Sequence, residues 1–182
     1  MKRGFSRMSG AVALALVCGT ASLAEAQNGP YYAAPSWNQT LACPTENSCP
    51  RFIVVMSGEA VLDRETGLVW ERSPSIQALL PWQAAQATCN RRLVGNRKGW
   101  RLPTIQDLAS LIDPSVAFPG PMLAAGHPFI GVHSASYWSA TSVSGSATAW
   151  RADFGSGAIT TTAIANPEFF WCVRGGHGPD AQ

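Results

Sequence analysis

The stretch Trp-Arg-Leu-Pro-Thr-Ile-Gln-Asp-Leu, residues 100–108, contains the clearest helix start in the chain. Thr104 is a favourable N-cap residue, and Asp107, three positions later, makes a variant of the capping box. The apolar positions that follow recur at helical spacing: Leu108, Leu111 and Ile112. Asp113-Pro114 would then end the helix. The pattern predicts a short amphipathic helix from Thr104 to about residue 112.

A second helix is predicted upstream, over residues 82–90. Pro81 stands where a first-turn proline is tolerated, and the apolar positions again recur at helical spacing: Trp82, Ala85 and Cys89. The loop between the two helices, residues 91–101, has five basic side chains and no acidic one. These are Arg91, Arg92, Arg97, Lys98 and Arg101.

The remaining segments favour strands. Residues 52–56 are apolar and β-branched, and residues 61–63 and 68–70 flank a turn at 64–67, which predicts a hairpin. After a Pro- and Gly-rich loop at 113–135, four more strands are expected at 136–141, 147–154, 158–164 and 169–174. Two helices among several antiparallel strands predict an α+β domain.

The first 26 residues have the pattern of a secretory signal peptide. Lys2, Arg3 and Arg7 precede the apolar run 11–18, and Ala24-Glu25-Ala26 is a small-x-small cleavage pattern. A membrane anchor is the alternative, but a spanning helix needs roughly twenty apolar residues. We therefore expect a periplasmic, secreted or cell-surface protein that is not inserted in the membrane after cleavage.

The charge balance argues against a nucleic-acid partner. Of 13 Lys and Arg and 11 Asp and Glu residues, three and one respectively lie in the first 26 positions, which leaves ten of each. A nucleic-acid binder normally has a strongly basic face. The apparent pI of about 8.4 therefore comes mostly from the predicted signal peptide.

Four cysteines remain after the predicted cleavage: Cys43, Cys49, Cys89 and Cys172. An even number in an oxidising compartment predicts disulfides, and three pairings are open. We favour Cys43–Cys49, which closes a short loop, with Cys89–Cys172, which joins two predicted core elements. A metal site is the alternative, but neither the Cys43/Cys49 spacing nor the positions of the histidines, His127, His133 and His177, follow a zinc-ligand pattern. We expect no metal and no cofactor.

Several motifs occur in one order along the chain. They are Gly67-Leu68-Val69-Trp70, the Trp82/Ala85/Cys89 helix, Trp100-Arg101-Leu102-Pro103-Thr104, Tyr137-Trp138-Ser139-Ala140-Thr141, Ala149-Trp150 with Phe154, and Cys172-Val173-Arg174-Gly175-Gly176. Together they resemble the Lcl C-terminal domain family, bacterial domains of unknown function named after a collagen-like adhesin. The resemblance divides the chain into a signal peptide (1–26), an irregular arm (27–57), the domain (58–177) and a tail (178–182).

The resemblance implies a C-type-lectin-like fold, of which a disulfide from helix to last strand is a signature. It also implies a distant relation to the formylglycine-generating, sulfatase-modifying enzymes. The calcium-binding tripeptides of the lectins (Glu-Pro-Asn, Gln-Pro-Asp and Trp-Asn-Asp) are missing here, and Cys89 and Cys172 are better explained as a structural link than as catalytic thiols.

Three functions remain open. We expect a non-catalytic envelope or surface module that binds a glycan or an extracellular protein, with an assembly component as the alternative and a sulfatase-modifying enzyme as a third. The candidate ligand-binding residues are Arg91, Arg92, Arg97, Lys98, Arg101 and Arg174, which could bind an anionic glycan through charge-assisted hydrogen bonds. The alternatives are an ordinary solvated loop, and, for Arg101 and Arg174, ion pairs with Asp63, Glu71, Asp107 or Asp153. The loop 113–135 and the connections within 139–167 are further candidate surfaces.

Overall fold

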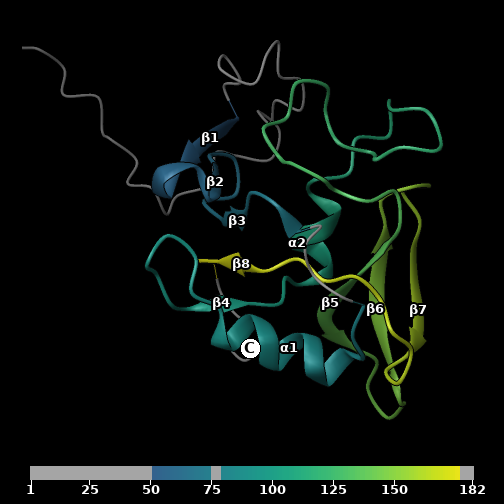
Figure 1. The fold of residues 1–182 in the computed structure, drawn as a ribbon. Coiled ribbons are helices and arrows are strands. Elements are labelled where there is room, and N and C mark those ends of the chain that lie inside the picture. Colours follow the sequence, from purple (N-terminus) through teal and green to yellow (C-terminus); the bar gives the residue numbers. More distant parts are fainter. Residues whose placement is uncertain (1–50, 75–78, 177–182) are drawn as a thin grey trace, which may run out of the picture.

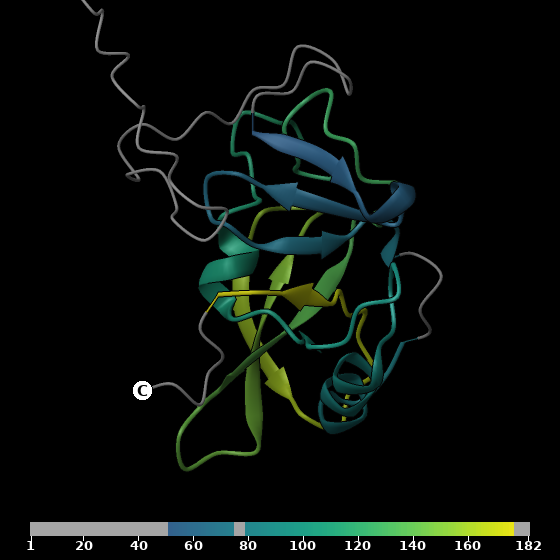
Figure 2. The same cartoon turned by 90° about the vertical axis from the view of Figure 1, so that its left-hand side faces the viewer.

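A computed structural model describes residues 51–74 and 79–176 of the chain. It contains two antiparallel sheets and two α-helices in this part, which confirms the predicted α+β class (Figure 1). One sheet has the strand order β1-β2-β3-β8-β4, and the other has the order β5-β6-β7. The strands of the two sheets cross at a steep angle (Figure 2). The strands are β1 (Phe52–Val55), β2 (Ala60–Asp63), β3 (Val69–Glu71), β4 (Trp100–Arg101), β5 (Ser136–Ser142), β6 (Thr148–Asp153), β7 (Ile159–Ala163) and β8 (Val173–Arg174), and the helices are η2 (Met56–Gly58), α1 (Trp82–Arg91) and α2 (Ile105–Ala109).

The predicted hairpin is confirmed as β2 and β3, which pair antiparallel. Asp63 shapes the connecting turn by accepting hydrogen bonds from Glu65 N and Thr66 Oγ1, at 3.1 and 2.9 Å. Its carboxylate also accepts hydrogen bonds from Nε and Nη2 of Arg51, at 2.9 and 2.8 Å, and both side chains are buried. Arg51 lies just before β1. This strand falls within the segment 27–57, which the resemblance assigns to an irregular arm, yet it pairs with β2 along its whole length.

Helix α2 has the predicted capping box. The Thr104 side chain accepts from Asp107 N, and the Asp107 carboxylate accepts from Thr104 N. The helix ends at Ala109 and not near residue 112, so the predicted length is wrong. The chain continues after Ala109 in tighter turns of the 3₁₀ type. The N–H groups of Leu111 and Ile112 donate to the carbonyls three residues earlier, at 3.1 and 3.2 Å.

A disulfide joins Cys89 on α1 to Cys172, as predicted, with a sulfur–sulfur distance of 2.05 Å. Both cysteines are fully buried, together with Ala85 one turn earlier on the same helix face. The expected Cys43–Cys49 link lies outside the described residues. The observed disulfide therefore fixes α1 to the segment that leads into β8.

The predicted strand 169–174 is wrong in extent, because only Val173–Arg174 forms β8. The residues before it pass from one sheet to the other. Trp138 N, on β5, donates to Phe169 O, whereas Glu71 N, on β3, donates to Cys172 O. Because these hydrogen bonds go to two different sheets, the segment cannot extend either sheet as a regular strand.

Aromatic side chains fill the core between the sheets and α1. The buried tryptophans are Trp70, Trp100, Trp138 and Trp171. Residues 110–135 contain neither helix nor strand, in agreement with the predicted long loop. None of the helices in the described part has the length and apolarity needed to cross a membrane.

Candidate functional site

The basic loop contains a tight hairpin, which is absent from the elements predicted from the sequence. Val94 and Arg97 exchange main-chain hydrogen bonds in both directions, at 3.3 and 2.9 Å. Between them, Gly95 and Asn96 have φ values of 56° and 57°, as in a type I′ turn. Glycine and asparagine are among the residues that adopt this left-handed conformation most readily, so the Gly95-Asn96 pair is the sequence feature from which the turn could be predicted.

Contacts with the rest of the domain hold this turn in place. Gly95 N donates to Glu59 Oε2 at 3.1 Å, and a Cβ at position 95 would lie 2.4 Å from the Met56 Cβ. Trp100, which is buried, donates from Nε1 to Arg97 O at 2.8 Å. The backbone of the turn is therefore anchored, while the Arg97 and Lys98 side chains are exposed.

The last strand adds a third cation to the turn. Arg174 Nε donates to Lys98 O over 2.9 Å, although the two residues are 76 positions apart. Arg97, Lys98 and Arg174 have no carboxylate within ion-pair distance in residues 51–74 and 79–176. We call residues 94–99 together with Arg174 the cationic turn.

An apolar hollow of about 190 Å³ adjoins the cationic turn. Its wall comes from the outer face of the five-stranded sheet, where Leu62, Val69 and Arg174 are successive cross-strand neighbours. Val55 and Met56 complete the apolar part of the lining. No local sequence pattern predicts this hollow, because its residues come from strands that meet only in the folded sheet.

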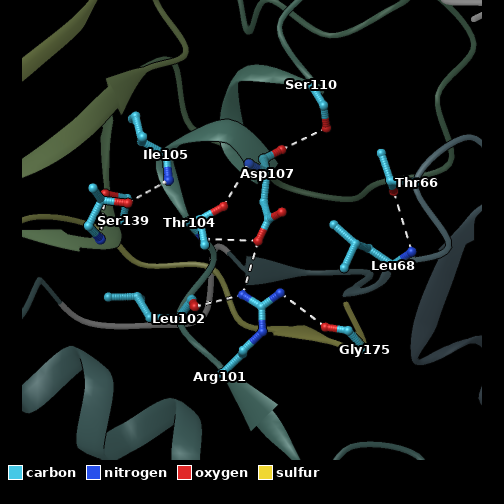
Figure 3. A network of polar contacts seen from close by, with 11 residues as sticks. Thr66, Leu68, Arg101, Leu102, Thr104, Ile105, Asp107, Ser110, Ser139 and Gly175 are labelled. Carbon is cyan, nitrogen blue, oxygen red and sulfur yellow. Dashed lines mark hydrogen bonds and ion pairs between the residues drawn. The ribbon is translucent and has the colours of Figure 1, made fainter. Parts of the chain in front are cut away.

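Arg101 lies outside the cationic turn and holds the fold together. Its Nη1 donates to Asp107 Oδ2 and to Leu102 O, at 3.0 and 3.1 Å, and its Nη2 donates to Gly175 O at 3.0 Å (Figure 3). The side chain is only 16% exposed. The ion-pair alternative is the one observed for this residue, and the guanidinium links β4 to α2 and to the end of β8.

Arg92 likewise forms an ion pair, in this case with Glu71. Its Nε lies 2.7 Å from Glu71 Oε1, an ion-pair contact without hydrogen-bond alignment, and Glu71 Oε2 accepts from Cys172 N at 3.2 Å. Burial raises the pKa of Glu71 above its usual 4.5, and the attraction of Arg92 opposes this only in part. The last candidate, Arg91, is exposed in the final turn of α1, where a cation interacts favourably with the helix dipole.

A larger hollow, of about 370 Å³, lies beside the Glu71–Arg92 pair. Its lining includes the acidic residues Glu59 and Glu71 as well as Arg72 and Arg92. The mixed charge makes it less suitable for an anion than the cationic turn. No three His, Cys, Asp or Glu side chains come together as a metal site within the described ranges.

The predicted site residues thus separate into different environments. The structure brings Lys98 and Arg174 together, with Arg97 on the same turn, and it places Arg92 and Arg101 in ion pairs.

A comparison with curated proteins finds no match. The family model of the Lcl C-terminal domain matches residues 59–174, well over half of the chain, from just before β2 to the end of β8. The chain belongs to the Lcl C-terminal domain family.

Proposed function

We propose that this protein is an exported, non-catalytic recognition module that binds an anionic glycan through the cationic turn. The observation that carries the proposal is the group formed by Arg97, Lys98 and Arg174, which has no carboxylate partner in the described part of the chain. Cations in a folded domain that are not neutralised internally attract anions to that surface.

The chemistry of the site favours sulfate or carboxylate groups. Arginine can donate two parallel hydrogen bonds to such a group, and lysine adds a mobile point charge. Arg174 uses Nε for Lys98 O, and its two terminal nitrogens have no hydrogen-bond partner in the described ranges, so they can donate to a ligand. The anchored backbone supports binding too, because little conformational entropy remains to be lost there when a ligand is bound.

The neighbouring hollow supports a glycan more than a free inorganic anion. One face of a sugar ring presents mainly C–H groups, and covering Leu62 and Val69 with it would remove apolar surface from water. A sulfated or carboxylated sugar would therefore place its anion on Arg174 and its ring on the outer face of the sheet.

Binding to an immobilised heparin-like polymer at increasing NaCl concentration tests the proposal. We expect salt-sensitive binding, because exposed charges are screened as ionic strength rises. The double variant Arg97→Gln/Lys98→Gln should lose at least tenfold in affinity. Arg64→Gln is a control, since it removes an exposed arginine from the turn between β2 and β3. Wild-type binding that resists high salt, or equal losses in the control, would overturn the proposal.

A further inference from the structure

The outermost strand of the three-stranded sheet, β7, has an open edge. Among the described residues it pairs with β6 alone, and Figure 1 shows it at the margin of the domain. Residues 155–167 contain no charged side chain, and β7 itself reads Ile-Thr-Thr-Thr-Ala. Proteins usually protect such an edge with lysine, proline or a bulge, because it can pair with another strand.

The pairing register shows which backbone groups face outward. The pair with β6 is closed by hydrogen bonds from Asp153 N to Ala158 O and from Ile164 N to Ala147 O. In an antiparallel pair the bonded positions alternate, so residues 158, 160, 162 and 164 bond to β6. Ile159, Thr161 and Ala163 therefore direct their N–H and C=O groups to the open edge.

These outward groups are almost all unused. The N–H and C=O groups of Ile159 and Thr161 and the N–H of Ala163 have no hydrogen-bond partner in residues 51–74 and 79–176. Ala163 O accepts from Asn166 N at 2.9 Å, and a carbonyl can accept a second bond. The three residues are evenly spaced about Thr161, which makes the edge complementary to itself.

We propose that β7 pairs antiparallel with β7 of a second copy of this chain, about a two-fold axis at Thr161. Each Thr161 then faces its equivalent, and each Ile159 faces Ala163 of the second copy. The two three-stranded sheets join into one continuous sheet. The neutrality of β7 allows this arrangement, because identical charges facing each other across a two-fold axis would repel.

The side chains on this face fit the same pairing. Ile159, Thr161 and Ala163 project to the face that carries Trp150, which lies opposite Thr161 on β6. Ile159 is 41% exposed and lines a shallow groove with Trp150 and Ile105. In the pair it would lie against the small side chain of Ala163, so its apolar surface is covered without a steric conflict.

The proposed interface is separate from the cationic turn. In Figure 1 the connection between α1 and β4, which carries that turn, lies on the side of the domain away from β7. Pairing through β7 therefore leaves both cationic turns exposed. Failure of glycan binding and failure of self-association would be independent results.

Sedimentation velocity of the purified protein, from low micromolar to near-millimolar concentration, tests the pairing. A five-residue strand pair is smaller than the roughly 1,600 Å² interface of typical stable complexes, so we expect reversible, concentration-dependent dimers. Thr161→Pro removes only an outward N–H and should give a monomer at all concentrations. Thr161→Val, the matched control, keeps the backbone donor and should dimerise like the wild type.

A second variant covers the case in which Thr161→Pro does not fold. Thr161→Lys places like charges opposite each other on the axis, so it should weaken dimerisation at least tenfold, and more at low than at high salt. A wild-type protein that remains monomeric throughout overturns the proposal. So does a folded variant, with proline or lysine at position 161, that dimerises like the wild type.

Discussion

Arg174 donates from Nε to the main-chain oxygen of Lys98 at 2.9 Å, and this contact brings the last strand to a turn 76 residues earlier. Strand β8 already pairs with β4, where Arg174 lies opposite Trp100. The sheet register therefore decides where the Arg174 guanidinium points. A cationic surface is formed here by topology, and no run of basic residues in the sequence contains it.

Arg101→Lys separates a structural from a binding role for this arginine. Lysine keeps the charge but cannot make the forked contacts with Asp107, Leu102 and Gly175, so we expect the free energy of unfolding to fall by about 1–3 kcal/mol. Urea denaturation measures this loss, and affinity for a heparin-like polymer should not change. Arg97→Lys, at an exposed position, should stay within about 0.5 kcal/mol of the wild type. If the Arg101→Lys variant were as stable as the wild type but bound the polymer more weakly, Arg101 would instead be a ligand-binding residue.

Removal of the buried disulfide should be strongly destabilising. Cys89 and Cys172 are 83 residues apart, and the chain-entropy model gives about 4–5 kcal/mol for a loop of this length. Urea denaturation of Cys89→Ala/Cys172→Ala measures the loss. The predicted Cys43–Cys49 link closes a far shorter loop, so Cys43→Ala/Cys49→Ala should lose only about 2 kcal/mol. Equal losses for the two double variants would contradict this interpretation.

The raised pKa of Glu71 predicts that the free energy of unfolding depends on pH in a specific direction. Its pKa is raised in the folded protein, chiefly by burial, so between the usual 4.5 and the folded value the native state binds the proton more tightly than the unfolded chain. The stabilising contribution is therefore complete below pH 4.5 and is lost as pH rises through the folded pKa. In denaturation curves across this range, the stability of the wild type relative to Glu71→Gln should decrease with rising pH. A constant difference would show that Arg92 and the Cys172 N–H balance the effect of burial, and an increasing difference would show that they outweigh it; either result would contradict the prediction.

Local sequence signals predicted the parts of the fold that local interactions build. Thr104 and Asp107 are three residues apart and form their capping box within one helical turn. The β2–β3 hairpin likewise depends on Asp63 and the turn next to it. Both Cys89 and Cys172 fall in predicted core elements, which favours their pairing, and the structure contains this disulfide.

Long-range packing decided what the sequence did not reveal. The apolar pattern of residues 169–174 predicts a full strand, but its hydrogen bonds are divided between two sheets. The six candidate basic residues were equivalent by charge alone. Their roles differ because Glu71 meets Arg92 and Asp107 meets Arg101, whereas no described carboxylate meets Lys98 or Arg174.

The most direct test of the cationic turn is an NMR titration of the isotope-labelled protein with a sulfated oligosaccharide. We predict that the amide signals of residues 94–99 and of Arg174 and Gly175 shift most, and that added NaCl reverses the shifts. The signals of the long loop at 113–135 should change little. Shifts confined to that loop, or no shifts at any accessible ligand concentration, would contradict the account.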